Sequence, residues 1–157
     1  LHHDQRVTTL SVSERRRQRH NLQRLHGECE LNYVRLLRLM PGPAQLGKAI
    51  NVDFTHESNS GMHIRTDEIT PYTQLLSIAA KSARPEWLPE IQIKVRIYHD
   101  AKMAEVVEWC SDRTIPWELA EKSSMQAPDE KWQWNMFLSD LLAHGLSHGM
   151  SKVKVTL

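Results

Sequence analysis

The chain has 157 residues, of which 40% are hydrophobic, and its 20 basic and 19 acidic side chains leave a formal net charge of +1. A chain of this length can form one domain with a sizeable core. Because the charges nearly balance, the net charge does not require a polyanionic partner. No apolar run is long enough to cross a membrane, and two widely separated cysteines do not make a secreted disulfide framework. We therefore expect a single cytoplasmic domain over residues 1–157 with no membrane partner.

A long helix is predicted near the start of the chain. Residues 1–12 lack a periodic apolar pattern and are interpreted as a flexible arm, and Ser13 is the expected N-cap of the helix. The helix should run to about Met40, because Pro41-Gly42-Pro43 cannot continue it. Its apolar residues recur every three or four positions, which places them on one face: Leu22, Leu25, Cys29, Tyr33, Leu36 and Met40.

The second half of this helix is more apolar than one buried face requires. Leu31, Val34 and Leu37 widen the apolar surface around its side. One sheet face that two helices must share cannot cover so wide a surface, so part of it is expected to remain for a protein partner or for a second copy of the chain. The interface candidates are Leu22, Leu25, Arg16, Arg19 and Trp132.

After the proline-rich stop, the apolar period changes from 3.6 to 2, which is typical of strands with one buried face. Short turns separate the segments, so about five mostly antiparallel strands are predicted, around residues 50–55, 62–67, 72–80, 91–98 and 103–109. A further short edge strand is possible over residues 153–157.

A second helix is predicted over about residues 129–146, and its end is expected at Gly145 or Gly149. Its buried stripe consists of Trp134, Phe137, Leu138, Leu141, Leu142 and Gly145. The expected fold class is therefore α+β, with a long N-terminal helix, an antiparallel sheet and a C-terminal helix packed on one sheet face.

Several blocks of the sequence resemble a known family. They include Cys29-Glu30-Leu31-Asn32-Tyr33, Arg96-Ile97-Tyr98-His99-Asp100-Ala101 and Leu146-Ser147-His148-Gly149. These blocks are similar to the YqiB-like proteins of gammaproteobacteria, over roughly residues 25–150. The resemblance implies a small cytoplasmic bacterial protein with a domain of unknown function, and it implies no activity and no catalytic residues.

Two sets of residues could carry catalysis or hold a metal. His99 and Asp100, with Glu105 on the next strand and His148 further on, could form an acid–base group if they converged, which would favour a hydrolase or a metal-dependent enzyme. Asp140, His144 and His148 are spaced four apart on one helix stripe, a spacing at which imidazoles can share a metal ion. The absence of a recognisable enzyme motif favours the structural interpretation of both sets, so no cofactor and no bound metal are expected.

Five arginines between residues 13 and 26 suggest a further alternative, nucleic-acid binding through the first helix. They spread around the helix, and no aromatic residue or known motif accompanies them. The leading hypothesis is therefore a protein-interaction or regulatory module without catalytic activity.

Overall fold

The computed structural model describes residues 11–54, 60–81, 90–109 and 128–155, and for residues 128–129 and 150–155 it describes the backbone alone. The elements in chain order are α1 (Val12–Leu39), β1 (Lys48–Phe54), β2 (Gly61–Ile69), β3 (Thr73–Lys81), β4 (Ile91–Tyr98), β5 (Met103–Trp109), α3 (Pro128–His148) and β6 (Gly149–Val155). Most of the turn expected between the first two predicted strands, and nearly all of the segment between the fifth predicted strand and the second predicted helix, lie outside the described residues.

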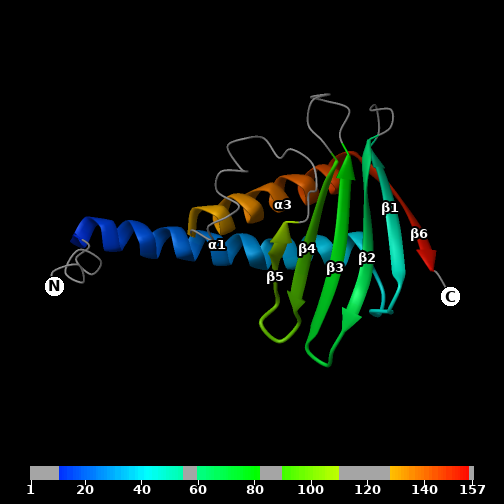
Figure 1. Ribbon diagram of the computed structural model, residues 1–157, viewed down its shortest axis with the longest axis horizontal. Coiled ribbons are helices and arrows are strands. Elements are labelled where there is room, and N and C mark those ends of the chain that lie inside the picture. The colour runs from blue at the N-terminus through cyan, green and yellow to red at the C-terminus, as the bar shows by residue number, and fades with distance from the viewer. Residues whose placement is uncertain (1–10, 55–59, 82–89, 110–127, 156–157) are drawn as a thin grey trace, which may run out of the picture.

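The described strands form one antiparallel sheet in the order β5-β4-β3-β2-β1-β6. Strands β1 to β5 follow one another as a meander, and β6 returns to pair with β1 along its whole length. Figure 1 shows α1 and α3 on the same side of this sheet. The predicted α+β fold, with a long first helix, five antiparallel strands and a C-terminal helix against the sheet, is confirmed.

The start of α1 differs from the prediction. Ser11, rather than Ser13, is the N-cap: its Oγ accepts a hydrogen bond from the Glu14 backbone N–H at 3.1 Å, and its own N–H donates to the Glu14 carboxylate at 3.3 Å. This reciprocal capping box requires an acidic residue three positions after the cap, and Glu14 stands at that distance from Ser11. The helix therefore begins two residues earlier than predicted, so residues 11 and 12 belong to its cap and first turn and not to a flexible arm. Residues 1–10 lie outside the described part.

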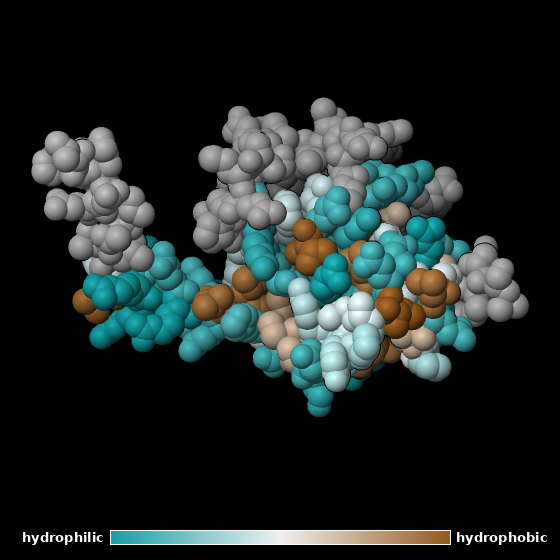
Figure 2. Space-filling model, turned by 60° about the horizontal axis from the view of Figure 1, so that its bottom comes forward, coloured by the Kyte–Doolittle hydropathy of each residue, from teal (hydrophilic) through white to brown (hydrophobic). Residues whose placement is uncertain are grey.

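The two halves of α1 have different surroundings. The C-terminal half packs against β5 and α3 and buries Cys29, Leu36 and Leu39. The N-terminal half extends past the β5 edge of the sheet, as Figure 1 shows, and residues 12–24 are exposed. Figure 2 shows this projecting half as a largely hydrophilic rod beside the body of the protein.

The core lies between the sheet and the inner faces of α1 and α3. Alternate strand residues point into it, and Leu138 and Leu142 of α3 are fully buried there. In the strand predicted at residues 91–98, Ile93, Val95 and Ile97 form the buried face, and Leu138 of the predicted helix stripe is buried as expected. Trp134, Phe137 and Leu141 were expected to be mostly buried as well, but they are only partly buried and pack against the edge of the cluster.

The C-terminal end of α3 also differs from the prediction. Gly145 does not end the helix, which continues to His148 and passes directly into β6 at Gly149. Gly145 is buried, and a Cβ there would collide with the Met62 side chain. The glycine is therefore explained by the close approach of α3 to β2, not by helix termination. The predicted edge strand at 153–157 correspondingly starts earlier, at residue 149.

Candidate functional site

His99, the residue on which the enzyme hypothesis depends, lies where β4 leads into its turn with β5. Its ring is held from two sides: Nδ1 lies 3.3 Å from the Tyr33 hydroxyl of α1, and Nε2 lies 3.3 Å from the Gln74 amide oxygen of β3. The Gln74 amide nitrogen donates in turn to Thr66 at 3.0 Å. Because the amide oxygen can only accept, Nε2 carries a proton, and in the neutral imidazole Nδ1 then accepts from the Tyr33 hydroxyl. Both ring nitrogens of His99 are thus occupied by a chain of hydrogen bonds that joins α1, β4, β3 and β2.

The carboxylates that could have activated His99 do not reach it. Asp100 is exposed in the turn. Glu105 instead accepts a hydrogen bond from the Tyr98 hydroxyl at 3.1 Å and pairs with Lys131 at 3.0 Å. Within the described residues, His99 therefore has no acidic partner, and the arrangement lacks the oriented base that general acid–base catalysis needs.

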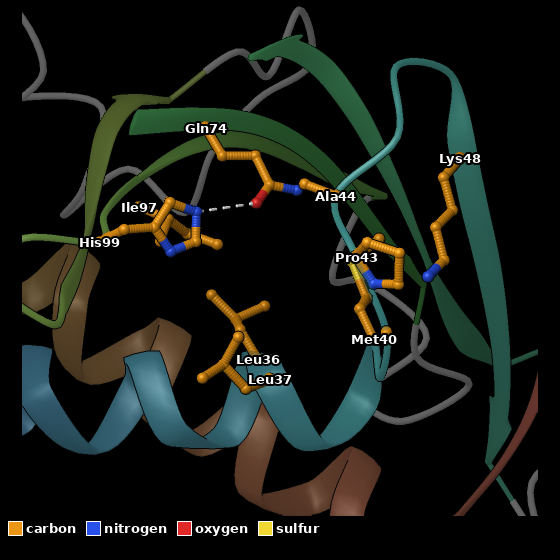
Figure 3. A pocket seen from close by; sticks show the side chains of 10 residues that line it. Leu36, Leu37, Met40, Pro43, Ala44, Lys48, Gln74, Ile97 and His99 are labelled. Carbon is orange, nitrogen blue, oxygen red and sulfur yellow. Dashed lines mark hydrogen bonds between the residues drawn. The ribbon is translucent and has the colours of Figure 1, made fainter. Parts of the chain in front are cut away.

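A small pocket opens beside His99, between the end of α1 and the sheet (Figure 3). Figure 3 shows Leu36 and Leu37 rising from α1 toward His99 and Gln74, with Lys48 on the opposite side. The cavity volume is about 50 Å³, well below the roughly 300–1,000 Å³ of most small-molecule sites. The pocket has room for a few water molecules but not for a substrate of ordinary size.

Lys48, at the other side of this pocket, has a structural partner. The residue is 8% exposed, and its ammonium donates to the carbonyl oxygen of Pro41 at 2.8 Å. The C-terminal end of a helix carries a partial negative charge, which favours a cation there. We therefore assign Lys48 to the junction between α1 and β1, where it fastens the turn after the helix.

His144 and His148 lie at the opposite end of the sheet from His99. Their rings stack at 4.8 Å between centroids, and His144 meets the Phe54 ring edge-on at 4.6 Å. Phe54 ends β1 beside the first residues of β2, whereas Gln74, the partner of His99, pairs with the last residue of β2. The length of β2 therefore separates the two imidazole groups, and the structure does not bring His99 and His148 together.

The possible metal stripe does not assemble either. Asp140 is exposed on the outer side of α3, while His144 is half-buried against Phe54. Across the described ranges, no three histidine, cysteine, aspartate or glutamate side chains are placed to hold a metal ion. The four-residue spacing of Asp140, His144 and His148 thus gives a common stripe but no converging ligand set.

A polar seam between α1 and α3 was not predicted from the sequence. It consists of Glu28, Asn32, Arg35, Asn135 and Ser139. The fully buried Asn32 donates to the Ser139 hydroxyl at 3.0 Å and accepts from Arg35 at 2.8 Å, and Arg35 also pairs with Glu28 at 3.3 Å. A signal was present, because Asn32 falls on the same helical face as Cys29 and Leu36. A polar residue on a buried stripe indicates a polar partner on the facing element.

Cys29 and Asn135 sit at the buried end of this seam. The Asn135 side chain accepts from the Val106 backbone N–H at 3.0 Å and donates to the Lys131 carbonyl at 2.7 Å, so it connects α3 to β5. The Cys29 thiol lies 3.9 Å from the same Asn135 oxygen. Burial, followed by the nearby charge of Glu105, raises the pKa of the Cys29 thiol from 9.0 to about 12. The thiol is therefore neutral and unreactive in the folded protein.

The raised pKa of Cys29 predicts a loss of stability at alkaline pH. Above pH 9.0 the unfolded chain releases the thiol proton, whereas the folded chain keeps it up to about pH 12. The free energy of unfolding should therefore be unaffected below the unfolded value and should fall above it by up to about 1.4 kcal/mol per pH unit. Urea unfolding of the wild type and of Cys29→Ala between about pH 8 and pH 10 measures this, because the variant lacks the thiol. Identical pH profiles for the two proteins would contradict the assignment.

The predicted interface residues lie along α1 and at the start of α3. Arg16, Arg19 and Leu22 are exposed on the projecting half of α1, and Leu22 is 52% exposed. Leu25 is half-buried at the point where the helix meets the body. Trp132 is also half-buried, and the Arg24 guanidinium lies over its ring at 5.3 Å from the centroid. Trp132 thus contacts α1 near the point where the N-terminal half of the helix extends beyond the sheet.

The most apolar exposed surface of α1 lies closer to its C-terminus. Leu31, Val34 and Leu37 are 49%, 46% and 43% exposed, respectively. They follow at intervals of three along the helix. Leu31 and Val34 face away from the side that buries Leu36 and Leu39, and Leu37 lies between that outer side and the rim of the pocket beside His99. We call these three residues the outer stripe. The sequence predicted that Leu31, Val34 and Leu37 would leave apolar surface uncovered, and their exposed fractions agree.

The described elements define a small α+β protein, with an antiparallel sheet covered on one face by a long N-terminal helix and a C-terminal helix. The chain belongs to the DUF1249 family, described as a protein of unknown function, whose model matches residues 35–151. It is 32% identical to the uncharacterised protein YqiB of Escherichia coli K12 over 132 residues, which are 81% of this chain and 89% of YqiB. YqiB of Escherichia coli O157:H7 matches equally. The predicted resemblance to YqiB-like proteins is confirmed.

No solved structure matches the chain. The family match begins at residue 35, so the arginine-rich, projecting half of α1 lies outside it. Neither of the described helices carries an apolar stretch long enough to cross a bilayer.

Proposed function

We propose that this protein is a protein-interaction module without catalytic activity, and that the outer stripe of α1 is its contact surface. The observation that carries the proposal is the exposure of Leu31, Val34 and Leu37, each more than two-fifths exposed along the C-terminal half of α1. A helix on the surface of a globular domain normally turns polar residues outward. Three large exposed apolar side chains in line along the helix are better explained by a partner than by the fold.

The projecting half of α1 supports the same proposal. Residues 12–24 are exposed, and their helix gains little from tertiary packing. Most helical stability in proteins comes from packing against other elements, so a lone segment of this length is marginal in water. A partner that contacts the outer stripe and extends toward the start of α1 would also reach the exposed Arg16 and Arg19. These residues would then form a basic rim next to the apolar contact.

The enzyme alternative draws no support from the geometry. His99 uses both ring nitrogens in structural hydrogen bonds, and His148 lies at the far end of the sheet. Nucleic-acid binding would require the arginines of the projecting half, which spread around the helix with no aromatic residue among them. The arginines suit an anionic neighbour, but the outer stripe is apolar and suits a protein.

The proposal is tested by association that depends on the outer stripe. The variant Leu31→Ser/Leu37→Ser should keep its fold, because both residues are exposed, and should lose self-association and the capture of partner proteins by the tagged full chain. Leu46→Ser is the matched control, since Leu46 is 67% exposed and lies outside α1. Light scattering and pull-down with cross-linking measure the effect.

Two outcomes would contradict the proposal. One is a wild-type chain that is strictly monomeric and recovers no partner. The other is tight, salt-dependent binding to a short DNA duplex that is unchanged in the stripe variant, which would favour the arginine-rich half as a nucleic-acid contact instead.

A further inference from the structure

We infer that the partner of the outer stripe is a second copy of this chain, with the two α1 helices crossing antiparallel about a twofold axis at Val34. This inference rests on the proposed function and names its partner.

The outer stripe is symmetric about Val34. In a twofold antiparallel pair, each residue before the axis faces the residue equally far after the axis on the other copy. Leu31 and Leu37 lie three positions on either side of Val34. Leu31 of each copy would therefore pack against Leu37 of the other, and the two Val34 side chains would meet on the axis.

The charges that flank the stripe have the same symmetry and opposite signs. Glu30 and Arg38 lie four positions before and after Val34, and both are exposed. The crossing places Glu30 of each copy beside Arg38 of the other, which makes two ion pairs at the rim. A parallel pair would instead place Glu30 against Glu30, which is repulsive. The charge pattern therefore selects the antiparallel arrangement.

Both charges are available for this contact. Among the described residues, Glu30 and Arg38 take part in no ion pair, whereas their neighbours Glu28 and Arg35 pair with each other inside the polar seam. Glu30 and Arg38 are also two helical turns apart, too far to pair within one helix. Two opposite charges on one helix face that are too far apart to pair with each other can each pair with a charge on another molecule.

Gly27 supplies an independent indication. It is exposed on the same side of α1, and a Cβ placed there would meet no atom within 4 Å, so the fold of one chain does not require a glycine. Glycine inside a helix costs about 1 kcal/mol relative to alanine. Gly27 lies seven positions before Val34, so it would face Pro41, at the start of the turn that ends α1 on the second copy. A residue without a side chain leaves room for that turn.

The contact is short, and a weak dimer is expected. The outer stripe spans about two helical turns, so the pair buries less than the roughly 1,200 Å² typical of a stable complex. Self-association should therefore appear as a monomer–dimer equilibrium that shifts with protein concentration. Sedimentation velocity of the full chain over a wide concentration range measures it.

Charge exchange provides the decisive test. Glu30→Arg and Arg38→Glu should each weaken the dimer at least about tenfold, because each replaces two attractive contacts by two repulsive ones. An equimolar mixture of the two variants should associate again, since an antiparallel heterodimer restores both ion pairs. The double variant Glu30→Arg/Arg38→Glu should also recover. Val34→Asp, which places two carboxylates on the axis, should abolish association, and Leu46→Ser should leave it unchanged.

The outcomes separate this inference from the proposed function. If the single charge variants associate as the wild type does, or if mixing them restores nothing, the antiparallel pairing is wrong. If the wild type is monomeric at every concentration but Val34→Asp abolishes the capture of a different protein, the second copy is wrong and the interaction module stands. If Val34→Asp changes neither self-association nor the capture of a different protein, the antiparallel dimer and the proposed interaction module are both wrong.

Discussion

Replacing Leu138 by alanine is expected to lower the free energy of unfolding by about 3 kcal/mol, within the range of measured leucine-to-alanine changes in protein cores. Leu138 is fully buried in the centre of α3, where it packs into the cluster of strand side chains. The truncation removes buried apolar surface and leaves a cavity. The cavity stays open because the sheet and the helix around it cannot move together enough to fill it. Urea unfolding followed by circular dichroism measures the loss.

Leu141→Ala is the matched control for this change. It is the same substitution on the same helix, but Leu141 is only partly buried and packs at the edge of the cluster. We expect it to cost less than half as much, on the order of 1 kcal/mol. Equal losses of unfolding free energy at the two positions would show that Leu138 does not lie at the centre of the core.

Replacing Gly149 by alanine is also expected to cost about 3 kcal/mol, at the upper end of overpacking penalties. Gly149 stands where α3 ends and β6 begins, and a Cβ there would collide with the backbone carbonyl of Gly145 and with the Val52 side chain. A backbone atom cannot move aside as the end of a flexible side chain can. Relief of the collision would therefore displace β6 from β1 or α3 from the sheet.

Gly27→Ala provides the opposite expectation. The site is open within one chain, and alanine is the better helix former, so the substitution should stabilise the monomer by about 0.5–1 kcal/mol. Thermal unfolding of both glycine variants at low protein concentration measures the contrast. A Gly149→Ala protein as stable as the wild type would contradict the tight junction between α3 and β6.

Much of the fold was predictable because it depends on local patterns. The change of apolar period after Pro43 separates α1 from the strands, and the alternation from Ile91 to Tyr98 predicts β4 with its observed bounds. The turn before Met103 was predicted from the residues 99–102, and Lys102 adopts the positive φ of 55° that such a tight turn can require. These features depend on neighbours within a few positions, which the sequence contains directly.

The capping of α1 was also encoded locally but was assigned to the wrong serine. Ser11 and Glu14 have the spacing of a capping box, whereas Ser13 does not have an acidic residue three positions later. Gly145 shows the opposite case. A glycine near a helix end usually terminates the helix, but here contact with Met62 decides its role, and that contact joins residues far apart in the chain.

The sequence by itself therefore determined the α+β class, the antiparallel meander, the end of α1 before Pro41 and the surplus of apolar residues on its second half. Only the tertiary structure decided that β6 pairs with β1, that His99 and His148 lie at opposite ends of the sheet, and that Asn32 meets Ser139 in a buried seam. The physical reason is the same in each case. Periodicity and turn residues specify local conformation, while the distance between two remote side chains depends on how whole elements pack.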